Sequence, residues 1–300
     1  MRVLVTGASG LVGSHLVAAL VASGNTVVAL SRHPDRHAWP EGVEAVAWDG
    51  IGPLPDVEAD AVVNLAGASV VGARWSRANM QEMLDSRIGV TRHVVDWANA
   101  QQPPARLVQA SAAGYYGAAD GPCHEDREAG SGFLAELARD WETAARKTKG
   151  PLAVLRFGHV LAGGGGYLGT LLPYVRWHLA GRVGGGRQPM PWVHIHDAVQ
   201  AILWSLGKAQ DGTYNVVSPG AAGMTQGEFA RKLAAAAGKR LQIPVPLLAI
   251  RVRYGAGAGH ALAKGADLRS DKLQAAGFRF KFPDLDEALD QLLKKRMPRK

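Results

Sequence analysis

Three glycines near the N-terminus constrain the fold of this 300-residue chain more than any other feature. They are Gly7, Gly10 and Gly13, and they separate a short apolar run from an apolar helical pattern. Gly7 permits a tight turn, Gly10 lets a ligand approach the backbone, and Gly13 lets the helix pack closely. The free N–H groups at the start of such a helix bind phosphate. The spacing therefore predicts a strand–turn–helix unit that binds a dinucleotide. The predicted cofactor contacts in this unit are Gly7, Ser9, Gly10, Leu11, Val12 and Gly13.

The first 160 residues alternate short apolar runs with helical patterns. Continuous runs of Val, Ala and Leu are typical of parallel strands that are buried on both faces. We expect strands at Val3–Val5, Thr26–Leu30, Val43–Ala47, Ala61–Leu65, Leu107–Ala110 and Leu152–Leu155. The helices expected between them are Leu11–Ser23, Asn79–Ala98 and Phe133–Thr148. This alternation predicts an α/β protein with a doubly wound parallel sheet, the Rossmann fold.

The pattern changes after residue 160, and we expect a smaller mixed and helical C-terminal lobe over residues 161–300. Parts of residues 190–220 are expected to complete the Rossmann sheet. The expected helices here are Tyr167–Leu179, Asp197–Leu206, Phe229–Ala237 and Leu285–Leu293, and the expected strands are Pro191–Ile195 and Thr213–Val217. Thr225 and Glu228 have the spacing of a capping box at the start of the third of these helices.

Charge and composition exclude several classes of protein. The formal net charge of +8 suits anionic ligands such as nucleotide phosphates. The basic residues are scattered except in the tail, residues 294–300, which we interpret as a solvated terminus and not as a nucleic-acid site. No apolar run approaches the roughly 20 residues of a membrane helix, so no membrane partner is expected. The single cysteine, Cys123, cannot form an internal disulfide, which favours a cytoplasmic location.

The end of the second expected strand indicates which dinucleotide binds. NAD-selective sites usually carry Asp or Glu there, whereas this strand ends with Ser31 and Arg32, and Arg36 follows. Arginine pairs with a 2′-phosphate and the serine hydroxyl donates to it, which favours NADP(H). The alternative is that Arg32 is a solvated loop residue. At the end of the fourth strand, the small residues of Leu65-Ala66-Gly67 leave room for the adenosine half, or they form a plain strand-to-loop turn.

Several further motifs carry a resemblance to a known family. They include Trp75 with Asp85-Ser86-Arg87, Ala110-Ser-Ala-Ala-Gly-Tyr-Tyr-Gly117, Trp141-Glu-Thr-Ala-Ala145, Arg156-Phe-Gly-His-Val160, Gly181-Arg-Val-Gly-Gly-Gly186 and Pro191-Trp-Val-His-Ile-His-Asp197. The chain resembles the extended short-chain dehydrogenase/reductases, and within them the atypical epimerase family, which is NAD-dependent epimerase/dehydratase-like. That branch adds a C-terminal domain of unknown function, here at about residues 245–295. The resemblance implies NADPH binding, with cofactor contacts at Ser31, Arg32, Leu65, Ala66, Glu82, Arg87 and Val160.

The sequence departs from active members of the extended group at the catalytic triad. Those proteins use a Ser or Thr four residues before a Tyr-Gly pair, and then a Tyr-x-x-x-Lys on the next helix. The tyrosine transfers a proton, and the lysine lowers its pKa and holds the nicotinamide ribose. Matching the motifs here puts Ala112 at the serine position, Leu134 at the tyrosine position and Ala138 at the lysine position. None of these three side chains can transfer a proton.

Substitute catalytic groups lie nearby. Tyr115 and Tyr116 are expected at the nicotinamide end of the sheet with Ser111 close to them, and we treat these three as the catalytic candidates. The alternative is that one tyrosine packs in the core and the other lines the cleft without chemistry. His194 and His196 are two residues apart on an expected strand, a spacing that suits a metal. No third ligand is evident beyond Asp197, so we expect no metal.

Two functional hypotheses remain open. In the first, the chain is an NADP(H)-dependent epimerase, for example of nucleoside-diphosphate sugars, or a reductase. Its small-molecule substrate would bind in the cleft between the Rossmann domain and the C-terminal lobe. In the second, the chain is a non-catalytic NADPH-binding sensor or scaffold that lacks the Ser-Tyr-Lys triad. Pairing of the helices around Trp97 and Trp141 into a homodimer is an expectation by analogy with the fold.

Overall fold

A seven-stranded parallel sheet forms the centre of the computed structural model, which describes residues 1–70, 74–207, 211–239, 242–255, 257 and 264–294. The order of its strands is β3-β2-β1-β4-β5-β7-β10. Their bounds are β1 Arg2–Thr6, β2 Thr26–Ser31, β3 Val43–Ala47, β4 Ala61–Asn64, β5 Arg106–Ala112, β7 Leu152–Phe157 and β10 Gly212–Val216. The order reverses between β1 and β4, where open α/β sheets bind ligands at the carboxyl ends of their strands. The predicted doubly wound Rossmann fold is confirmed.

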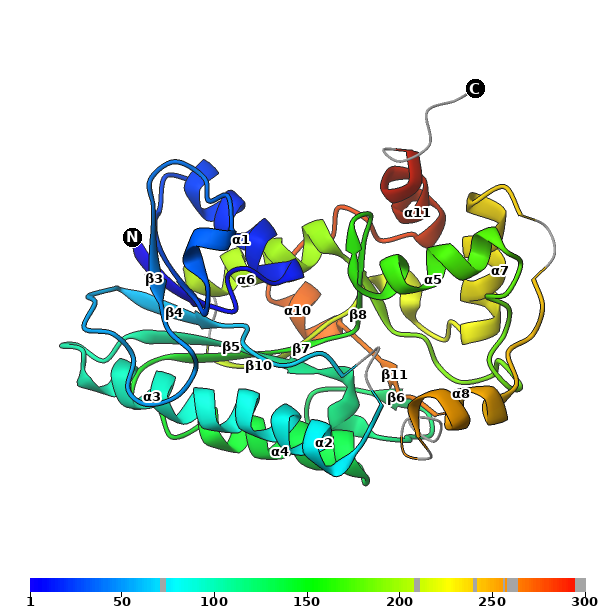
Figure 1. Cartoon of the computed structure of the whole chain (residues 1–300), viewed down its shortest axis with the longest axis horizontal. Coiled ribbons are helices and arrows are strands. Elements are labelled where there is room, and N and C mark those ends of the chain that lie inside the picture. The colour runs from blue at the N-terminus through cyan, green and yellow to red at the C-terminus, as the bar shows by residue number, and fades with distance from the viewer. Residues whose placement is uncertain (71–73, 208–210, 240–241, 256, 258–263, 295–300) are drawn as a thin grey trace.

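Helices cover both faces of this sheet (Figure 1). α1 (Leu11–Ala22) and α6 (Ile195–Gly207) lie on one face, and α3 (Val90–Ala100) and α4 (Phe133–Ala145) lie on the other. Alternate residues along each strand feed the two apolar layers between sheet and helices. Val3 and Val5 pack on the α1 side, for example, whereas Leu4 packs on the α3 side. Burial on both faces explains the near-continuous apolar runs in these strands.

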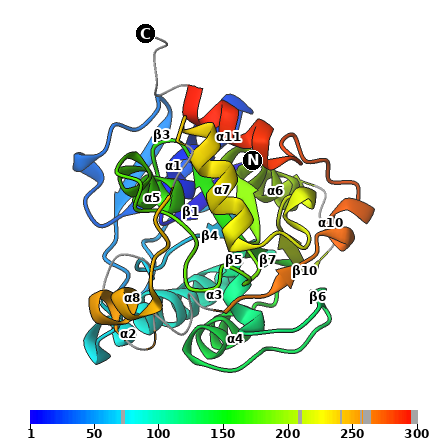
Figure 2. The same ribbon diagram turned by 90° about the vertical axis from the view of Figure 1, so that its right-hand side faces the viewer.

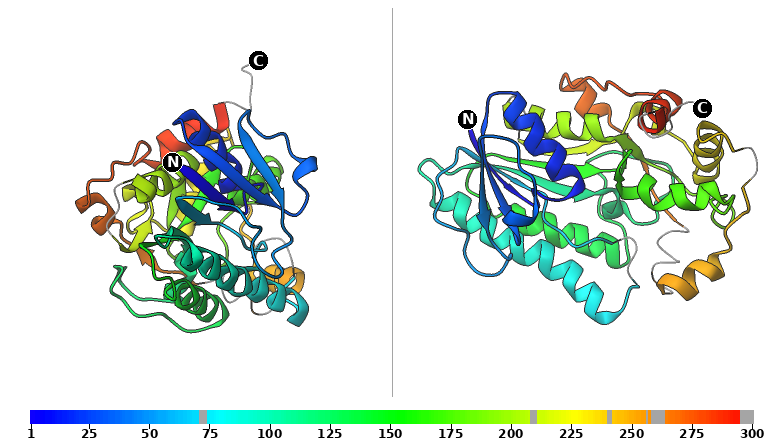
Figure 3. Two further views of the ribbon diagram at one scale, coloured as in Figure 1. Left: turned by 90° about the vertical axis from the view of Figure 1, so that its left-hand side faces the viewer. Right: turned by 45° about the horizontal axis from the view of Figure 1, so that its top comes forward.

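The C-terminal lobe lies beside the carboxyl ends of the strands and collects segments that are distant in sequence (Figures 2 and 3). Its main helices are α5 (Gly166–Arg176), α7 (Gln226–Ala236), α8 (Leu247–Tyr254) and α11 (Leu285–Lys294). The short helix α10 is Asp271–Ala275. Two small parallel sheets pair β8 (His159–Ala162) with β9 (Trp192–His194) and β6 (Pro122–Cys123) with β11 (Asp267–Leu268). Thr225 caps α7 by accepting from the N–H of Glu228 at 3.2 Å, as the capping box predicts.

The expected single helix over Asn79–Ala98 is wrong in one respect. The chain forms α2 (Arg77–Leu84), then a π-helical turn over Asp85–Gly89, and then α3. Ser76 caps α2 by accepting from the N–H of Asn79. A π turn inserts an extra residue into a helix, which periodicity does not reveal, and such turns are frequent at functional sites.

The two histidines do not share a face of one strand, because β9 ends at His194 and α6 begins at Ile195. The ring of His194 instead accepts from the backbone N–H of His196 at 3.0 Å. Asp197 accepts from the N–H groups of Lys281 and Phe282 at 2.9 Å each. This segment therefore fastens the C-terminal part of the chain to α6. Within the described ranges, no three His, Cys, Asp or Glu side chains are grouped as metal ligands.

Two remaining expectations concern the basic tail and membrane-spanning helices. Residues 295–300, most of the basic tail, lie outside the described residues. Among the helices that the structure describes, none is long and apolar enough to cross a membrane.

Candidate functional site

The glycine turn joins β1 to α1 at the point where the strand order reverses. Gly7 has φ +64°, and a Cβ there would lie 2.8 Å from the carbonyl oxygen of Leu65. A Cβ at Gly13 would collide with the carbonyl oxygen of Gly7. Both positions therefore require glycine, one for its backbone conformation and close neighbour and the other for the close approach of the helix. The turn is held by the N–H of Gly10, which donates to the carbonyl of Gly7 at 3.0 Å.

The start of α1 is arranged to receive an anion. Its N-cap is Gly10, which offers no side-chain cap, and its first turn contains no acidic residue. Leu11 and Val12 are half-buried there, and Ser9 and Gly10 are exposed. Uncapped N–H groups and the positive end of the helix dipole together bind phosphate.

The end of β2 lies next to this turn because β2 pairs with β1. Ser31 is buried and is the last residue of the strand, and its hydroxyl oxygen accepts from the N–H of His33 at 3.3 Å. That contact leaves the hydroxyl proton available to a ligand. Arg32 follows with an exposed side chain that has no carboxylate partner among the described residues. Ser31 and Arg32 thus sit together at the carboxyl edge of the sheet, as the sequence predicted.

The loop after β4 faces the glycine turn from the other side. A Cβ on Gly67 would come within 2.8 Å of the guanidinium carbon of Arg87, so the two residues are in contact. The hydroxyl of Ser86 accepts from the N–H of Ala68 at 2.9 Å. The π-helical turn carries both Ser86 and Arg87, so this turn contacts the loop after β4.

Arg87 is a cation in partly apolar surroundings. It donates to the carbonyl of Met83 at 3.3 Å, and its guanidinium lies 5.1 Å from the centre of the Trp141 ring. Burial lowers its pKa to about 10, so it stays charged at neutral pH. No carboxylate pairs with it among the residues described. A charged group held in this way is well placed to meet an anionic ligand. Glu82 lies five residues earlier with an exposed side chain on α2, and it makes no hydrogen bond or ion pair to the described residues of the loop.

A buried polar ladder, which the sequence analysis missed, fixes the strand ends around the switch point. Thr6, Asn64 and Gln109 are the partners of one another across β1, β4 and β5. The Thr6 hydroxyl donates to Asn64 Oδ1 at 2.6 Å, and Asn64 Nδ2 donates to Gln109 Oε1 at 2.9 Å and to the Thr91 hydroxyl at 2.8 Å. The signal in the sequence was a polar residue near the end of each of three apolar strands. Satisfied buried networks of this kind make a site rigid.

A second buried network occupies the region where the catalytic triad is expected. Ser111 donates to Glu142 Oε1 at 2.7 Å. Both oxygens of Glu142 are also bound by Arg156, at 2.8 and 2.9 Å, and both side chains of this pair are 2% exposed. Arg146 adds a third cationic contact to Glu142 at 2.8 Å. The Ser111 hydroxyl group therefore already donates its hydrogen bond to a carboxylate.

Tyr116 belongs to the same network. Its hydroxyl accepts from Arg156 at 2.8 Å and donates to Asn215 Oδ1 at 2.8 Å. Burial is the main reason that its pKa is raised to about 12. Tyr115 differs, since it is half-buried and its hydroxyl makes no hydrogen bond within the described part of the chain. The guanidinium of Arg156 lies 3.5 Å from the centre of the Tyr115 ring.

The positions that match the triad contain no proton-transfer group. Ala112 is exposed at the end of β5, and Ala138 is buried on α4. Leu134 lies against the turn before Tyr115, because a Cβ on Gly114 would be 3.3 Å from Leu134 Cβ. The structure therefore places the leucine beside the strand end where a catalytic tyrosine would be required.

One pair of polar rings near this edge was given no role from the sequence. His159 stacks on Tyr167 with ring centres 4.7 Å apart, and neither side chain makes a hydrogen bond to another described residue. Burial lowers the pKa of His159 to about 4 and raises that of Tyr167 to about 12, so both are neutral at pH 7. Gly166, which directly precedes Tyr167, contacts Leu11, since a Cβ on Gly166 would lie 2.6 Å from that side chain. The same Cβ would lie 3.4 Å from the carbonyl of Val160, which brings that predicted contact close to the α1 start.

The fold and this edge define a dinucleotide-binding protein of the extended Rossmann type. The family model described as "NAD dependent epimerase/dehydratase family" matches residues 3–217, and a model for a domain of unknown function, DUF1731, matches residues 245–292. The chain belongs to the NAD-dependent epimerase/dehydratase family. The resemblance inferred from its motifs is confirmed.

Relatives match over nearly the whole chain. An epimerase family protein of Mycobacterium bovis is 36% identical over 296 residues, which cover 96% of each chain. The crystal structure of the human epimerase family protein SDR39U1 with NADPH superposes with a TM-score of 0.87, 31% identity, and 97% and 99% coverage of the two chains. A structure named as a nucleoside-diphosphate sugar epimerase from Corynebacterium glutamicum has a TM-score of 0.77 and 25% identity. That match covers 98% of this chain and 58% of the other.

Proposed function

We propose that this chain binds NADP(H) at the carboxyl edge of β1, β2 and β4 and uses it to reduce or epimerise a small carbonyl or nucleotide-linked sugar substrate. The observation that carries the proposal is the set of uncompensated positive groups along this edge. They are the uncapped start of α1 and the guanidinium groups of Arg32 and Arg87. An acid at the end of β2, which NAD-selective sites usually carry, is replaced here by Ser31 and Arg32. The human relative solved with NADPH supports the same choice of cofactor.

The residues present fit a dinucleotide that carries an extra phosphate. The α1 start would hold the pyrophosphate and Ser31 with Arg32 would hold the 2′-phosphate. Leu65, Ala66 and Gly67 would pack on the adenosine half, and Val160 would face the nicotinamide half. Arg87 would meet an anionic or hydroxyl group over Gly67. When bound, the cofactor supplies or accepts a hydride.

Among the catalytic candidates, we assign proton transfer to Tyr115. A reduction needs one proton for the oxygen of the carbonyl that receives the hydride. Ser111 and Tyr116 are hydrogen-bonded to Glu142, Arg156 and Asn215, whereas the Tyr115 hydroxyl makes no hydrogen bond with any residue that the structure describes. Tyr115 also follows β5 directly, next to the strand end where the family places its catalytic serine.

A second candidate function is an NADPH-binding sensor or scaffold without turnover. It is favoured by the buried Ser111–Glu142–Arg156–Tyr116 network, because these polar groups already have hydrogen-bond partners within the protein. Under this alternative the cofactor edge serves binding only.

A direct test follows NADPH oxidation at 340 nm with sugar nucleotides, carbonyl compounds and quinones as substrates. We expect turnover that Tyr115→Phe lowers by roughly a hundredfold or more, in line with the loss of an acid–base group. Tyr116→Phe is the matched variant, and we expect it to lower stability and not the turnover of the folded protein. Tight NADPH binding with no NADPH oxidation by any substrate class, and with no epimerisation of sugar nucleotides in the presence of NADP+, would reject the enzyme and leave the sensor. Equal loss of turnover in both variants would reject the role of Tyr115.

A further inference from the structure

The C-terminal lobe carries most of the large apolar side chains that the described surface exposes. Six of the eight such residues lie on α5, on the turn that follows it, on the segment before α8, and on α8 itself. They are Tyr174, Trp177, Leu179, Ile243, Leu248 and Val252, and we call them the apolar lobe surface. Only Met1 and Ile51 of this set lie in the Rossmann part. Clusters of exposed apolar side chains usually mark interaction sites.

Backbone hydrogen bonds bring the segments that carry these residues together. The N–H of Ile243 donates to the carbonyl of His178 at 2.7 Å, next to Trp177. Two residues later, the N–H of Val245 donates to the carbonyl of Arg182 at 2.9 Å, and α8 begins directly afterwards. Figure 2 shows α5 and α8 on the side of the molecule that faces the viewer.

α8 presents an outward apolar face. Leu248 and Val252 are four residues apart and therefore lie on the same side of the helix, and they are 70% and 68% exposed. Ile250, between them in sequence, is buried against the lobe. Trp177 is the most exposed aromatic residue described, at 78%. Nothing among the described residues covers these side chains.

The chain segments that carry this surface contain basic residues and no acidic ones. Residues 143–196 and 229–266, which contain every member of the apolar lobe surface, have no Asp or Glu. Arg251 and Arg253 flank Val252 with exposed side chains, and Arg176 precedes Trp177. Two copies of this chain would therefore repel one another at this face, whereas an anionic partner would be attracted.

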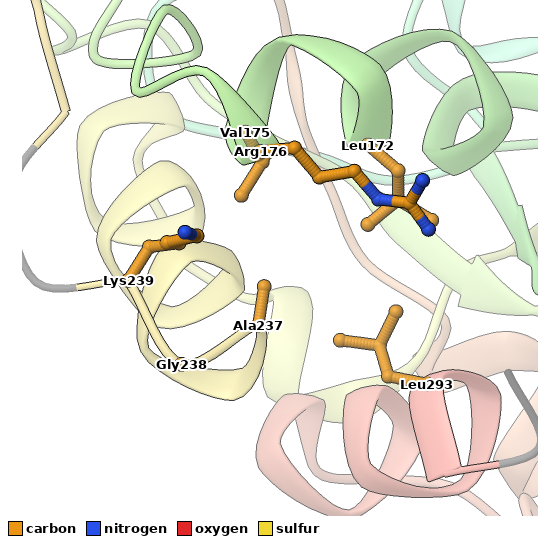
Figure 4. Close-up of a pocket in the computed structure, with 7 residues that line it drawn as sticks. All are labelled: Leu172, Val175, Arg176, Ala237, Gly238, Lys239 and Leu293. Carbon is orange, nitrogen blue, oxygen red and sulfur yellow. The ribbon is translucent and has the colours of Figure 1, made fainter. Parts of the chain in front are cut away.

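A hollow next to Trp177 combines the same two properties. It has a volume of about 350 Å³ and lies between α5, the end of α7 and the end of α11. Its walls include Leu172, Val175 and Leu293, and Arg176 and Lys239 stand at its edge (Figure 4). Apolar walls beside two cations fit a phosphate group that continues into an acyl chain.

We propose that the apolar lobe surface docks this protein onto an anionic phospholipid bilayer. Trp177 and the Leu248–Val252 face of α8 enter the headgroup region, where tryptophan and amphipathic helices are favoured. Arg176, Arg251 and Arg253 approach the lipid phosphates. Nucleic acid is the other polyanion, but aliphatic side chains do not stack on bases. The sequence predicted no membrane partner because it lacks a long apolar run. Such a run marks a spanning helix, which a docking surface does not need.

The test is co-sedimentation of the full chain with vesicles of phosphatidylcholine alone or with one third phosphatidylglycerol. We expect binding to the anionic vesicles only. Leu248→Glu should lower the partition coefficient by roughly tenfold or more, since a leucine that enters the headgroup region is replaced by a charge. Arg251→Glu should lower it by at least roughly fivefold. Ile51→Glu is the matched control, because Ile51 is 79% exposed on the Rossmann part, and it should change nothing.

A second measurement does not depend on charge reversal. Lipids brominated in the acyl chain should quench part of the tryptophan fluorescence, and Trp177→Phe should remove that part. Absence of binding to anionic vesicles would overturn the proposal. Equal effects of Ile51→Glu and Leu248→Glu would do the same, as would a single-stranded oligonucleotide that binds more tightly than the vesicles at the same salt concentration.

Discussion

The carboxyl edge of the sheet is built in two different ways on its two sides. Beside β1, β2 and β4, the uncapped start of α1 and the cations Arg32 and Arg87 have no carboxylate partner among the described residues. Beside β5 and β7, the polar groups of Ser111, Tyr116 and Arg156 are buried and bound to one another or to Glu142 and Asn215. The positive charges of the first side are balanced only when an anionic ligand binds. The polar groups of the second side already have partners within the protein.

This difference explains how the chain can keep a cofactor site while the triad positions are lost. A buried ion pair between Glu142 and Arg156 requires other polar groups to satisfy its remaining hydrogen bonds. Ser111 and Tyr116 supply them. Ser111 and Tyr116 therefore support a structural ion pair, and Tyr115 makes no hydrogen bond to it among the described residues.

The largest effect should follow from breaking the second side. Glu142→Gln leaves Arg156 charged, buried and without a carboxylate, and we expect the free energy of unfolding to fall by about 3 to 5 kcal/mol. Urea denaturation followed by circular dichroism measures this loss. Glu136→Gln, an exposed change on the same helix, should cost less than about 0.5 kcal/mol. A loss below about 1 kcal/mol for Glu142→Gln would contradict the structural role of the pair.

Acid should lower the free energy of unfolding through the protonation of His159. Burial lowers the pKa of this histidine to about 4 in the folded state, against about 6.5 in an unfolded chain. Since the folded-state pKa is the lower one, the full stability is present above about pH 6.5 and is lost as the pH falls toward 4. The loss reaches up to about 3 kcal/mol. His159→Phe keeps an aromatic ring on Tyr167 but cannot titrate, so its unfolding free energy should fall less between pH 7 and pH 4. Identical pH dependence in both proteins would refute this prediction.

Replacing Arg32 should remove the preference of the first side for the 2′-phosphate of NADPH. We expect Arg32→Ala to weaken NADPH binding by roughly ten- to hundredfold, the value of a charged hydrogen bond, and to change NADH binding little. Fluorescence titration of both cofactors measures the ratio. Arg92→Ala, an exposed change on α3, should leave both affinities unchanged. Equal affinities of the unmodified protein for NADPH and NADH would overturn the assignment of Ser31 and Arg32.

The sequence predicted the first side much better than the second, for a physical reason. The glycine turn, the end of β2 and the loop after β4 are local features, each read from a few consecutive residues after a buried strand. The ladder of Thr6, Asn64 and Gln109 depends on the register of three strands, which no single segment reveals. Glu142 and Arg156 lie on an amphipathic helix and in an apolar strand, where their pairing arises only from packing. The π-helical turn was missed because hydrophobic periodicity continues through it.

The same limit applies to the lobe. Its positive charge was evident in the composition, but the scattered basic residues of the sequence gave no hint that they surround exposed apolar side chains. Trp177 and Val252 are 75 residues apart in the chain, and the pairing of residues 243–245 with the turn after α5 brings their elements onto one face. Surfaces assembled from distant segments become visible only in the fold.

The smallest effect should separate rigidity from charge on the first side. Ser86→Ala removes the hydroxyl that accepts from the N–H of Ala68, and leaves Arg87 and its charge in place. We expect the affinity for NADPH to fall only severalfold, because one neutral hydrogen bond contributes about 1 kcal/mol. Ser76→Ala also removes a serine hydroxyl that accepts from a backbone N–H, but at the cap of α2, at the opposite end of the loop from Gly67 and Ala68. It should lower stability by about 1 kcal/mol and leave NADPH binding unchanged. A titration in which the two variants lose NADPH affinity equally would show that Ser86 acts through the general stability of the helix and not through the loop after β4.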